Sequence, residues 1–289
     1  MVITPTNIKS ILASLGARPE KAFGQNFLID QTVLSSVVTA AELSPTDVVL
    51  EIGPGLGVLT EDLLATGASV YAIERDRKFI DHLMARFGVK GQRFFLTQGD
   101  AVVLNWNTLL PSDKPWKLVS NLPYAISSYA LRMALWGERP ASRVVVMLQR
   151  EVAERALALL RGETDASQTS LLSLMLALSC SSGEIVRRVA PGSFFPPPKV
   201  ESAILLLSPM TQAERLKRWG IGPERIMQLA KQAFAHPRKQ LFSTLGWRDS
   251  SETLSKALNI PSRVRPEALS ADQWASLAKN GDKLTDKAA

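Results

Sequence analysis

Hydrophobic and polar positions alternate along residues 6–207 in the pattern of strands followed by amphipathic helices. Short apolar, β-branched runs predict strands at 47–52, 69–73, 93–96, 117–120, 143–148, 184–189 and 203–207. Hydrophobic residues spaced three or four apart predict helices at 6–15, 31–41, 58–65, 77–87, 127–136, 151–160 and 171–180. This alternation predicts an α/β fold.

From Pro209 onward only short helical patterns remain, at 223–234, 239–245, 252–258 and 271–279. We therefore expect an α/β domain at 1–208 and a small helical domain at 209–289. The net charge of +7 is concentrated in the second, which carries 14 Lys and Arg against 8 Asp and Glu. A basic domain beside a nearly neutral one indicates an anionic partner such as a nucleic-acid backbone. The alternative is a charged surface that serves only solubility.

Composition narrows the class of protein further. No apolar run reaches the ~18–20 residues needed to span a bilayer, and residues 1–21 lack the pattern of a secretory signal. Cys180, the only cysteine, cannot form an intramolecular disulfide, and it is expected to be buried. His82 and His236 lie too far apart to indicate a metal cluster. We expect a cytoplasmic protein with no membrane contact and no metal, and a monomer as the simplest state.

A glycine-rich turn follows the first predicted strand and leads into a helix. Its glycines, Gly53, Gly55 and Gly57, follow the pattern G-x-G-x-G, one residue shorter at the third glycine than a dinucleotide site. Glycines allow positive φ and close approach of the backbone to a ligand. Glu51 lies two residues before the first glycine, which favours a compact cofactor with an amino-acid portion over one with a pyrophosphate.

Acidic residues follow the next two strands. Glu74 lies 21 residues after Gly53, close to the spacing at which a carboxylate accepts from ribose hydroxyls. Asp100 could accept from the exocyclic amine of an adenine. The alternatives are a surface ion pair of Glu74 with Arg75 or Arg77, and a simple Gly-Asp turn at Asp100.

The turn Asn121-Leu-Pro-Tyr124 follows the fourth predicted strand, where open α/β sheets bind ligands. Asn121 offers a carbonyl acceptor, Pro123 stiffens the backbone, and Tyr124 supplies a flat ring. Such a turn suits a planar ring that carries an amine. An ordinary strand-to-helix turn is the alternative. Residues 24–28 could form a lid over a ligand or simply a loop docked on the core. The proline-rich loop 194–202 could fix a Phe ring and Lys199, and a rigid linker is the alternative.

Taken in order, these motifs resemble those of the KsgA/RsmA family of small-subunit ribosomal RNA adenine dimethyltransferases. The likeness covers about residues 21–207 and, more weakly, the tail. It is carried by Gly24-Gln-Asn-Phe-Leu28, Glu51-Ile-Gly-Pro-Gly55, Glu74, Gly99-Asp100, Asn121-Leu-Pro-Tyr124, Met147-Leu-Gln-Arg-Glu-Val-Ala153, Phe194-x-Pro-x-Pro-Lys-Val-x-Ser202 and Arg238-Lys-x-Leu241.

The resemblance implies a Rossmann-like, S-adenosylmethionine-dependent methyltransferase sheet with a C-terminal helical RNA-binding domain. It implies dimethylation of N6 of two adjacent adenosines in the 3′-terminal hairpin loop of 16S rRNA, with the 30S subunit as partner during ribosome biogenesis. The implied cofactor contacts are Asn26, Leu28, Gly53, Gly55, Glu74, Asp100 and Asn121. The implied target-base contacts are Asn121, Leu122, Pro123, Tyr124 and Phe194, with Tyr124 and Phe194 on the two faces of the base. The implied RNA contacts are Lys199, Arg238 and Lys239.

The sequence departs from the family at three places. Ala125 stands where an Asn usually follows the active-site turn, residues 166–170 lack a Tyr-Gly, and His236-Pro precedes Arg238-Lys239 where basic or amide residues are common. Three other functions are weighed against this one. They are a 23S rRNA adenine methyltransferase of the erythromycin-resistance type, a non-catalytic RNA-binding assembly factor on the same fold, and a nicotinamide dehydrogenase, which the glycine spacing disfavours.

Overall fold

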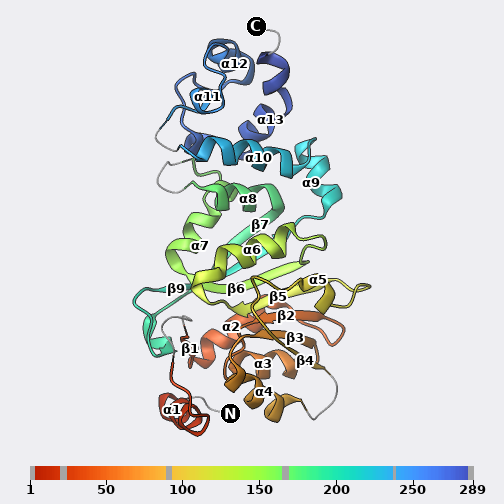
Figure 1. Ribbon diagram of the computed structural model, residues 1–289, viewed down its shortest axis with the longest axis vertical. Coiled ribbons are helices and arrows are strands. Elements are labelled where there is room, and N and C mark those ends of the chain that lie inside the picture. The colour runs from red at the N-terminus through yellow and green to blue at the C-terminus, as the bar shows by residue number, and fades with distance from the viewer. Residues whose placement is uncertain (1–3, 20–24, 89–92, 165–168, 237–238, 286–289) are drawn as a thin grey trace. The chain divides into compact units, whose positions relative to one another are not determined.

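A computed structural model describes residues 4–19, 25–88, 93–164, 169–236 and 239–285, and the chain divides into two compact units (Figure 1). The first unit is Met1–Ala153 with Glu184–Pro209, and the second is Glu154–Gly183 with Met210–Ala289. This division differs from the sequence expectation of 1–208 and 209–289. Residues 154–183 group with the C-terminal helices, because their apolar helix packs against three of them.

Most of the strands and helices lie close to the ranges that the hydrophobic pattern predicts. The strands are β1 (Phe27–Leu28), β2 (Val48–Ile52), β3 (Ser69–Glu74), β4 (Phe94–Gln98), β5 (Trp116–Asn121), β6 (Arg143–Gln149), β7 (Cys180–Val189), β8 (Phe194–Phe195) and β9 (Ser202–Pro209). The helices are α1 (Pro5–Ser14), α2 (Gln31–Ala41), α3 (Val58–Ala65), α4 (Arg77–Phe87), α5 (Trp106–Leu109), α6 (Ser127–Trp136), α7 (Arg150–Leu157), α8 (Leu171–Ser179), α9 (Gln212–Trp219), α10 (Pro223–Phe234), α11 (Leu241–Thr244), α12 (Ser251–Leu258) and α13 (Ala271–Thr285).

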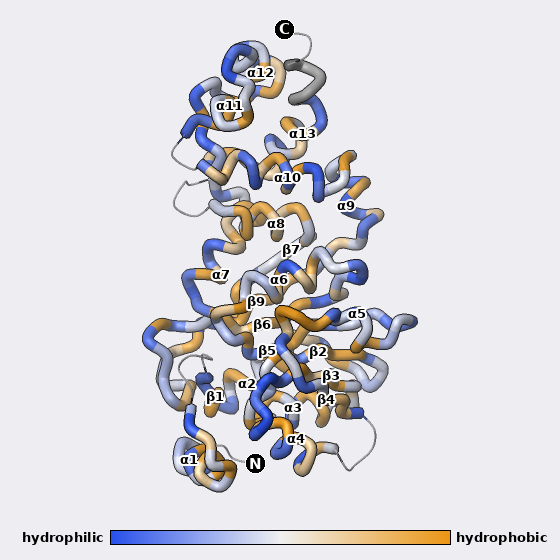
Figure 2. Tube along the Cα trace, viewed as in Figure 1, coloured by the Kyte–Doolittle hydropathy of each residue, from blue (hydrophilic) through white to orange (hydrophobic). Residues whose placement is uncertain are grey.

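The main sheet has the strand order β4-β3-β2-β5-β6-β9-β7. Strands β2 to β6 pair in parallel, whereas β9 runs antiparallel to β6, from Val144 opposite Leu207 to Gln149 opposite Ser202. A central strand covered on both faces needs a continuous apolar run. Strand β6 shows this, since Val144 to Leu148 are at most 1% exposed, and the central strands are mainly hydrophobic in Figure 2.

Helices cover both faces of this sheet (Figure 1). On one face α4 packs against β3 and β4, and α2 packs against β5, β6 and β9. On the other, the ring of Trp106 in α5 meets those of Trp116 in β5 and Tyr129 in α6 edge to face. Helix α4 begins after Asp76, whose carboxylate accepts from the Lys78 amide and satisfies a donor of the first turn.

The second unit is held by packing among α8, α10 and α13. The indole N–H of Trp219 in α9 donates to the Leu178 carbonyl at 2.9 Å, and the rings of Phe234 and Trp274 stack at 6.0 Å. Helix α9 was not predicted, because most of its residues are polar and only a few of its positions are buried. Among the helices of the described residues, none has the length and apolarity needed to cross a membrane.

Strands β2 and β5 separate at their carboxyl ends. Their backbone ladder stops at Leu50 opposite Leu118, and two residues later the buried Ser120 hydroxyl bridges the gap. It donates to the Ile52 carbonyl at 2.7 Å and accepts from the Ile52 amide at 3.3 Å. The chain turns one way after β2 and the other after β5, which is the switch point where α/β sheets open a crevice.

We expect Ser120→Ala to lower the free energy of unfolding by about 1–3 kcal/mol, because it leaves buried groups of Ile52 without this partner. Urea unfolding measures the change. Ser142→Ala is the matched control, since that exposed serine also donates to a strand carbonyl, that of Trp116. Its loss should stay below about 0.5 kcal/mol. Equal losses in the two variants would contradict the bridging role of Ser120.

Candidate active site

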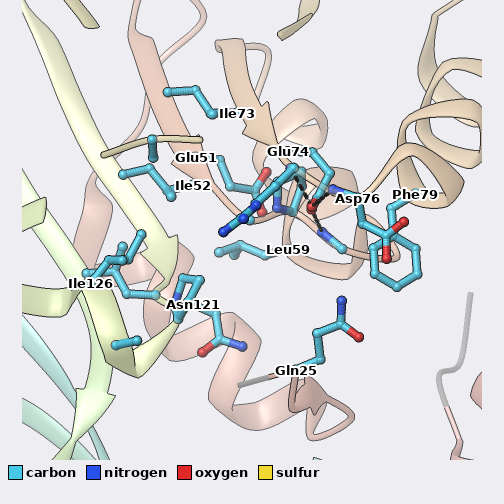
Figure 3. A pocket seen from close by; sticks show the side chains of 18 of the residues that line it. Gln25, Glu51, Ile52, Leu59, Ile73, Glu74, Asp76, Phe79, Asn121 and Ile126 are labelled. Atoms are coloured by element: carbon cyan, nitrogen blue, oxygen red, sulfur yellow. Dashed lines mark hydrogen bonds between the residues drawn. The ribbon is translucent and has the colours of Figure 1, made fainter. Parts of the chain in front are cut away.

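A cavity of about 470 Å³ lies at the carboxyl ends of β2, β3 and β5, within the first unit. Its lining includes ten of the residues that the sequence singles out. They are Asn26, Leu28, Gly53, Gly55, Glu74, Asp100, Asn121, Leu122, Pro123 and Tyr124. Figure 3 shows Glu51 and Glu74 together on one side of this cavity and Asn121 on another. The volume of the cavity is typical of a small-molecule site.

The glycine turn after β2 approaches two other parts of the wall. Gly53 has φ +68°, and a Cβ there would lie 3.3 Å from the Pro123 ring. Gly55 has φ +57°, and a Cβ there would lie 3.2 Å from the ring of Phe27 in β1. Both positions therefore need glycine for backbone conformation and for space.

Glu74, at the end of β3, is held by backbone amides. Its Oε1 accepts from the amides of Arg75 at 2.7 Å and Asp76 at 2.9 Å, and its Oε2 accepts from Gly55 at 3.1 Å. Burial raises the pKa of this carboxyl above its ordinary value, and the three hydrogen bonds oppose that rise. The bond to Gly55 joins the glycine turn to the end of the neighbouring strand.

Glu51 is a second carboxyl at the cavity, and it is 2% exposed. The Thr60 hydroxyl donates to its Oε2 at 2.7 Å. Burial raises the pKa of Glu51 to about 8, the Thr60 bond opposes the shift, and the charge of Glu74 adds to it. Three amide donors oppose the rise in the pKa of Glu74, whereas a single hydroxyl donor opposes it at Glu51.

Asp100 lies just after β4 and is partly exposed. Its Oδ1 accepts from the Val102 amide at 2.9 Å, and its Oδ2 lies 3.3 Å from Nη1 of Arg75. Arg75 also lines the cavity, a role that the sequence did not indicate. The structure therefore pairs Arg75 with Asp100.

The turn after β5 presents its groups in different directions. The Asn121 amide nitrogen donates to the Asn26 carbonyl at 3.3 Å, so the oxygen of the same side chain is the atom suited to accept from a ligand. The Pro123 carbonyl already accepts from the Ile126 amide at 3.1 Å and from the Ser127 hydroxyl at 3.5 Å. This leaves the carbonyl of Leu122, whose side chain is buried, as the more available backbone acceptor.

Tyr124 lines the cavity and its hydroxyl forms a hydrogen bond of 2.6 Å with the Ser202 hydroxyl. Burial raises the pKa of Tyr124, and this hydrogen bond opposes the rise. Ala125 is exposed at the edge of the cavity. The departure from the family pattern therefore lies at an exposed position.

The N-terminal segment closes the cavity through β1. Strand β1 pairs with β8, with Phe27 opposite Phe195 and Leu28 opposite Phe194. The Ile29 amide also donates to the Ser193 carbonyl at 2.9 Å. A strand of two residues is too short to show an alternating hydrophobic pattern, and its partner is distant in sequence. The pairing of β1 with β8 was therefore not predicted.

Three other predicted contact residues, among those that the structure describes, lie outside the cavity lining. Phe194 is 2% exposed and belongs to the hydrophobic cluster that includes Phe27 and Leu28 of β1, and its ring does not line the cavity. Lys199 is exposed in the segment between β8 and β9. Lys239 is exposed in the second unit, and Arg238 lies outside the described residues.

Several lining residues were not identified as site residues from sequence. Phe79 of α4 is buried below the cavity, and its ring meets Phe27 edge to face at 5.8 Å. Its only sequence signal is a hydrophobic position in an amphipathic helix, which equally fits a core residue. Among the described residues, no group of three or more His, Cys, Asp or Glu is arranged to hold a metal ion.

Comparison with known proteins places this geometry in context. The profile of the family described as Ribosomal RNA adenine dimethylase matches residues 16–283. A protein named Ribosomal RNA small subunit methyltransferase A from Synechococcus elongatus is 38% identical over 280 residues, covering 93% of this chain and 97% of that protein. One of the same name from Dehalococcoides mccartyi is 36% identical over 276 residues, covering 93% and 90%.

Two solved structures show the same fold. A dimethyladenosine transferase from Plasmodium falciparum superposes with a TM-score of 0.70 at 26% identity, over 89% of this chain and 98% of that one. The 23S rRNA methyltransferase ErmE superposes with a TM-score of 0.65 at 23% identity, over 89% and 100%. The sheet with its cavity is therefore a Rossmann-like methyltransferase architecture.

The raised pKa of Glu51 makes a prediction about stability. Unfolding returns this carboxyl to an ordinary pKa near 4.5, so its contribution to stability is complete below pH 4.5. That contribution is lost as the pH rises toward about 8, by at most about 1.4 kcal/mol per pH unit. Relative to Glu51→Gln, the wild type should therefore lose stability between pH 5 and pH 8 in urea unfolding.

Glu184→Gln is the control for this experiment, because it removes a carboxyl of the same kind from an exposed position. The stability difference between this variant and the wild type should stay nearly constant over the same range. A difference between wild type and Glu51→Gln that does not change with pH would contradict a neutral, buried Glu51.

Proposed function

The chain belongs to the ribosomal RNA adenine dimethylase family, and from this we propose that it dimethylates N6 of two adjacent adenosines in the 3′-terminal hairpin loop of 16S rRNA, with S-adenosylmethionine as methyl donor. The observation that carries the proposal is the cavity, where the acidic ends of β2 and β3 meet the Asn-Leu-Pro-Tyr turn after β5. A compact cofactor and a flat base that carries an amine would meet there.

The residues present fit S-adenosylmethionine. The positive φ of Gly53 and Gly55 and the space at their missing Cβ atoms let the backbone approach the methionine portion. Glu74 accepts one amide hydrogen bond at Oε2 and two at Oε1, so Oε2 keeps a lone pair for a ribose hydroxyl. Asp100 lies at the next strand end, where it can accept from the adenine amine of the cofactor. Asn26 and Leu28 close the cavity from the N-terminal segment.

The target amine is a poor nucleophile, because its lone pair is delocalised into the adenine ring. Hydrogen bonds from its two N–H groups to the Asn121 side-chain oxygen and the Leu122 carbonyl would draw the nitrogen toward tetrahedral geometry. Its lone pair can then face the methyl group that the cofactor supplies. Alignment of two bound reactants can lower the barrier by about 7–11 kcal/mol. The methylated nitrogen is acidic, so its proton leaves to solvent without a dedicated base.

Tyr124 supplies a face on which the base can stack, worth about 1–3 kcal/mol per base. Stacking helps to offset the cost of extruding the adenosine from its loop. The electron-rich ring also favours the positive charge that passes to the nitrogen. For Phe194 to cover the second face, its ring has to leave the hydrophobic cluster in which it now packs.

The partner that we propose is 16S rRNA within the 30S subunit. The tail from Pro209 carries 14 basic against 8 acidic residues, and Lys199 and Lys239 are exposed. Such residues suit phosphate contacts, which position the protein without reading sequence. We propose Arg238 as a further RNA contact on the strength of its motif.

Methyl transfer from labelled S-adenosylmethionine to unmethylated 30S subunits tests this function, with 50S subunits and free 23S RNA in parallel. We expect dimethyladenosine, identified after digestion, from 30S subunits alone. Label in 23S RNA would instead indicate a methyltransferase of the resistance type. Cofactor binding without label in either RNA would indicate an assembly factor, and Ala125 would then be the first residue to restore to Asn.

The glycine turn gives a prediction about cofactor affinity. Gly53→Ala should weaken S-adenosylmethionine binding by at least about 10-fold in isothermal titration, because a side chain at positive φ costs about 1–2 kcal/mol and its Cβ presses on Pro123. Gly162→Ala is the control. Gly162 has φ +79° with open space around its Cβ position, so it shares the backbone strain without the contact. Equal losses of affinity in both variants would contradict the proposed cradle.

Asn121 is expected to act on turnover more than on cofactor binding. Asn121→Ala should lower kcat by about 100- to 1000-fold, the usual cost of losing one preorganised hydrogen bond to the reacting group. The Kd for S-adenosylmethionine should change far less. Asn121→Asp, which keeps an acceptor and removes the donor to Asn26, should lose less turnover than Asn121→Ala. Equal losses of kcat and cofactor affinity in Asn121→Ala would exclude the role given to this side chain.

A further inference from the structure

Ser202 is the first residue of β9, and its side chain is fully buried. It lies opposite Gln149 in the antiparallel pair with β6. The residue before it is fixed as well, since the Arg150 amide donates to the Glu201 carbonyl at 2.9 Å and Arg150 Nη1 lies 2.5 Å from Glu201 Oε2. The end of β6 therefore sets the position of the Ser202 hydroxyl.

The Ser202 hydroxyl contacts a residue that is distant in sequence. Its Oγ lies 2.6 Å from Tyr124 Oη, across 78 residues of sequence and from the other side of β6 in the strand order. Tyr124 is thus held at its backbone by the turn after β5 and at its hydroxyl by β9. Because the Tyr124 ring is fixed at both ends of its long axis, it keeps a single orientation relative to the cavity that it lines.

We propose that Ser202 is a positioning residue that fixes the ring of Tyr124 and thereby governs how completely the second methyl group is transferred. This inference rests on the proposed dimethylation. An unmodified adenine amine has two N–H groups, one for the Asn121 oxygen and one for the Leu122 carbonyl. After the first transfer a single N–H remains, so one of these two hydrogen bonds is lost.

With one hydrogen bond gone, the orientation of the nitrogen depends more on the ring against which the base stacks. In the second transfer the nitrogen lone pair forms a bond to the methyl carbon. The bond from that carbon to sulfur breaks, its electron pair stays on sulfur, and the last N–H proton leaves to solvent. Misalignment of the stacked base therefore slows the second transfer more than the first.

The test compares Ser202→Ala, Tyr124→Phe and the double variant with the wild type. Each is incubated with unmethylated 30S subunits and labelled S-adenosylmethionine, and monomethyladenosine and dimethyladenosine are quantified over time. Tyr124→Phe keeps the ring and leaves β9 unchanged, so it tests the same bond if Ser202→Ala does not fold. Tyr71→Phe and Ser173→Ala are controls that remove hydroxyls away from the cavity lining.

We expect each single variant to slow the second transfer by about 3- to 10-fold, the worth of one hydrogen bond, and to accumulate monomethyladenosine. The double variant should be no slower than either single variant, because both remove the same bond. The KM for 30S subunits and the Kd for the cofactor should change little, and the two controls should keep the wild-type product ratio.

The outcomes separate this inference from the function on which it rests. If the wild type gives no dimethyladenosine, the proposed function fails. If the wild type gives dimethyladenosine and both single variants keep its product ratio, the inference is overturned. Additive losses in the double variant, or a loss in KM rather than in the second rate constant, would also overturn it, because they would show that the two hydroxyls act separately or on RNA binding.

Discussion

The close approach of Gly53 to Pro123 is the contact on which the site depends. A Cβ at Gly53 would lie 3.3 Å from the proline ring, so the turn after β2 and the turn after β5 meet with no room for a side chain between them. The strands that carry these turns have already separated, and the Ser120 hydroxyl occupies the gap in their ladder. The sheet opens a crevice there, and the two turns become its opposite walls.

Two buried carboxyls beside this crevice show how local donors set the charge of a site. Glu74 receives three amide hydrogen bonds, which favour its charged form, whereas Glu51 receives one from Thr60 and lies in the field of Glu74. Like charges at close range cannot both ionise cheaply. The three amide donors therefore oppose the effect of burial on Glu74 more than the single Thr60 hydroxyl does on Glu51, and Glu51 has the pKa that is raised to about 8.

Much of this arrangement was predictable from sequence, because it depends on local patterns. Apolar runs gave the strands, amphipathic periods gave most helices, and parallel strands place their carboxyl ends at one edge, so the residues after β2, β3 and β5 had to meet. The β1·β8 pair, the antiparallel β9 and the partners of Asp100 and Tyr124 depend on the tertiary fold. Phe194 shows this limit, since its motif does not indicate that its ring packs in the hydrophobic cluster.

The N-terminal segment connects the two ends of the cavity. The Asn26 carbonyl accepts from the side-chain amide nitrogen of Asn121, and β1 pairs with β8, which carries Phe194. The segment that would close over the cofactor is thus hydrogen-bonded to the residue that would hold the target amine and is paired with the strand that carries the second aromatic ring. A displacement of β1 must therefore disturb the cover of the cavity, the hydrogen bond to Asn121 and the pairing with β8. Thermodynamic linkage then requires that whatever stabilises β1 at the cofactor end also favours order at the base end, and the reverse.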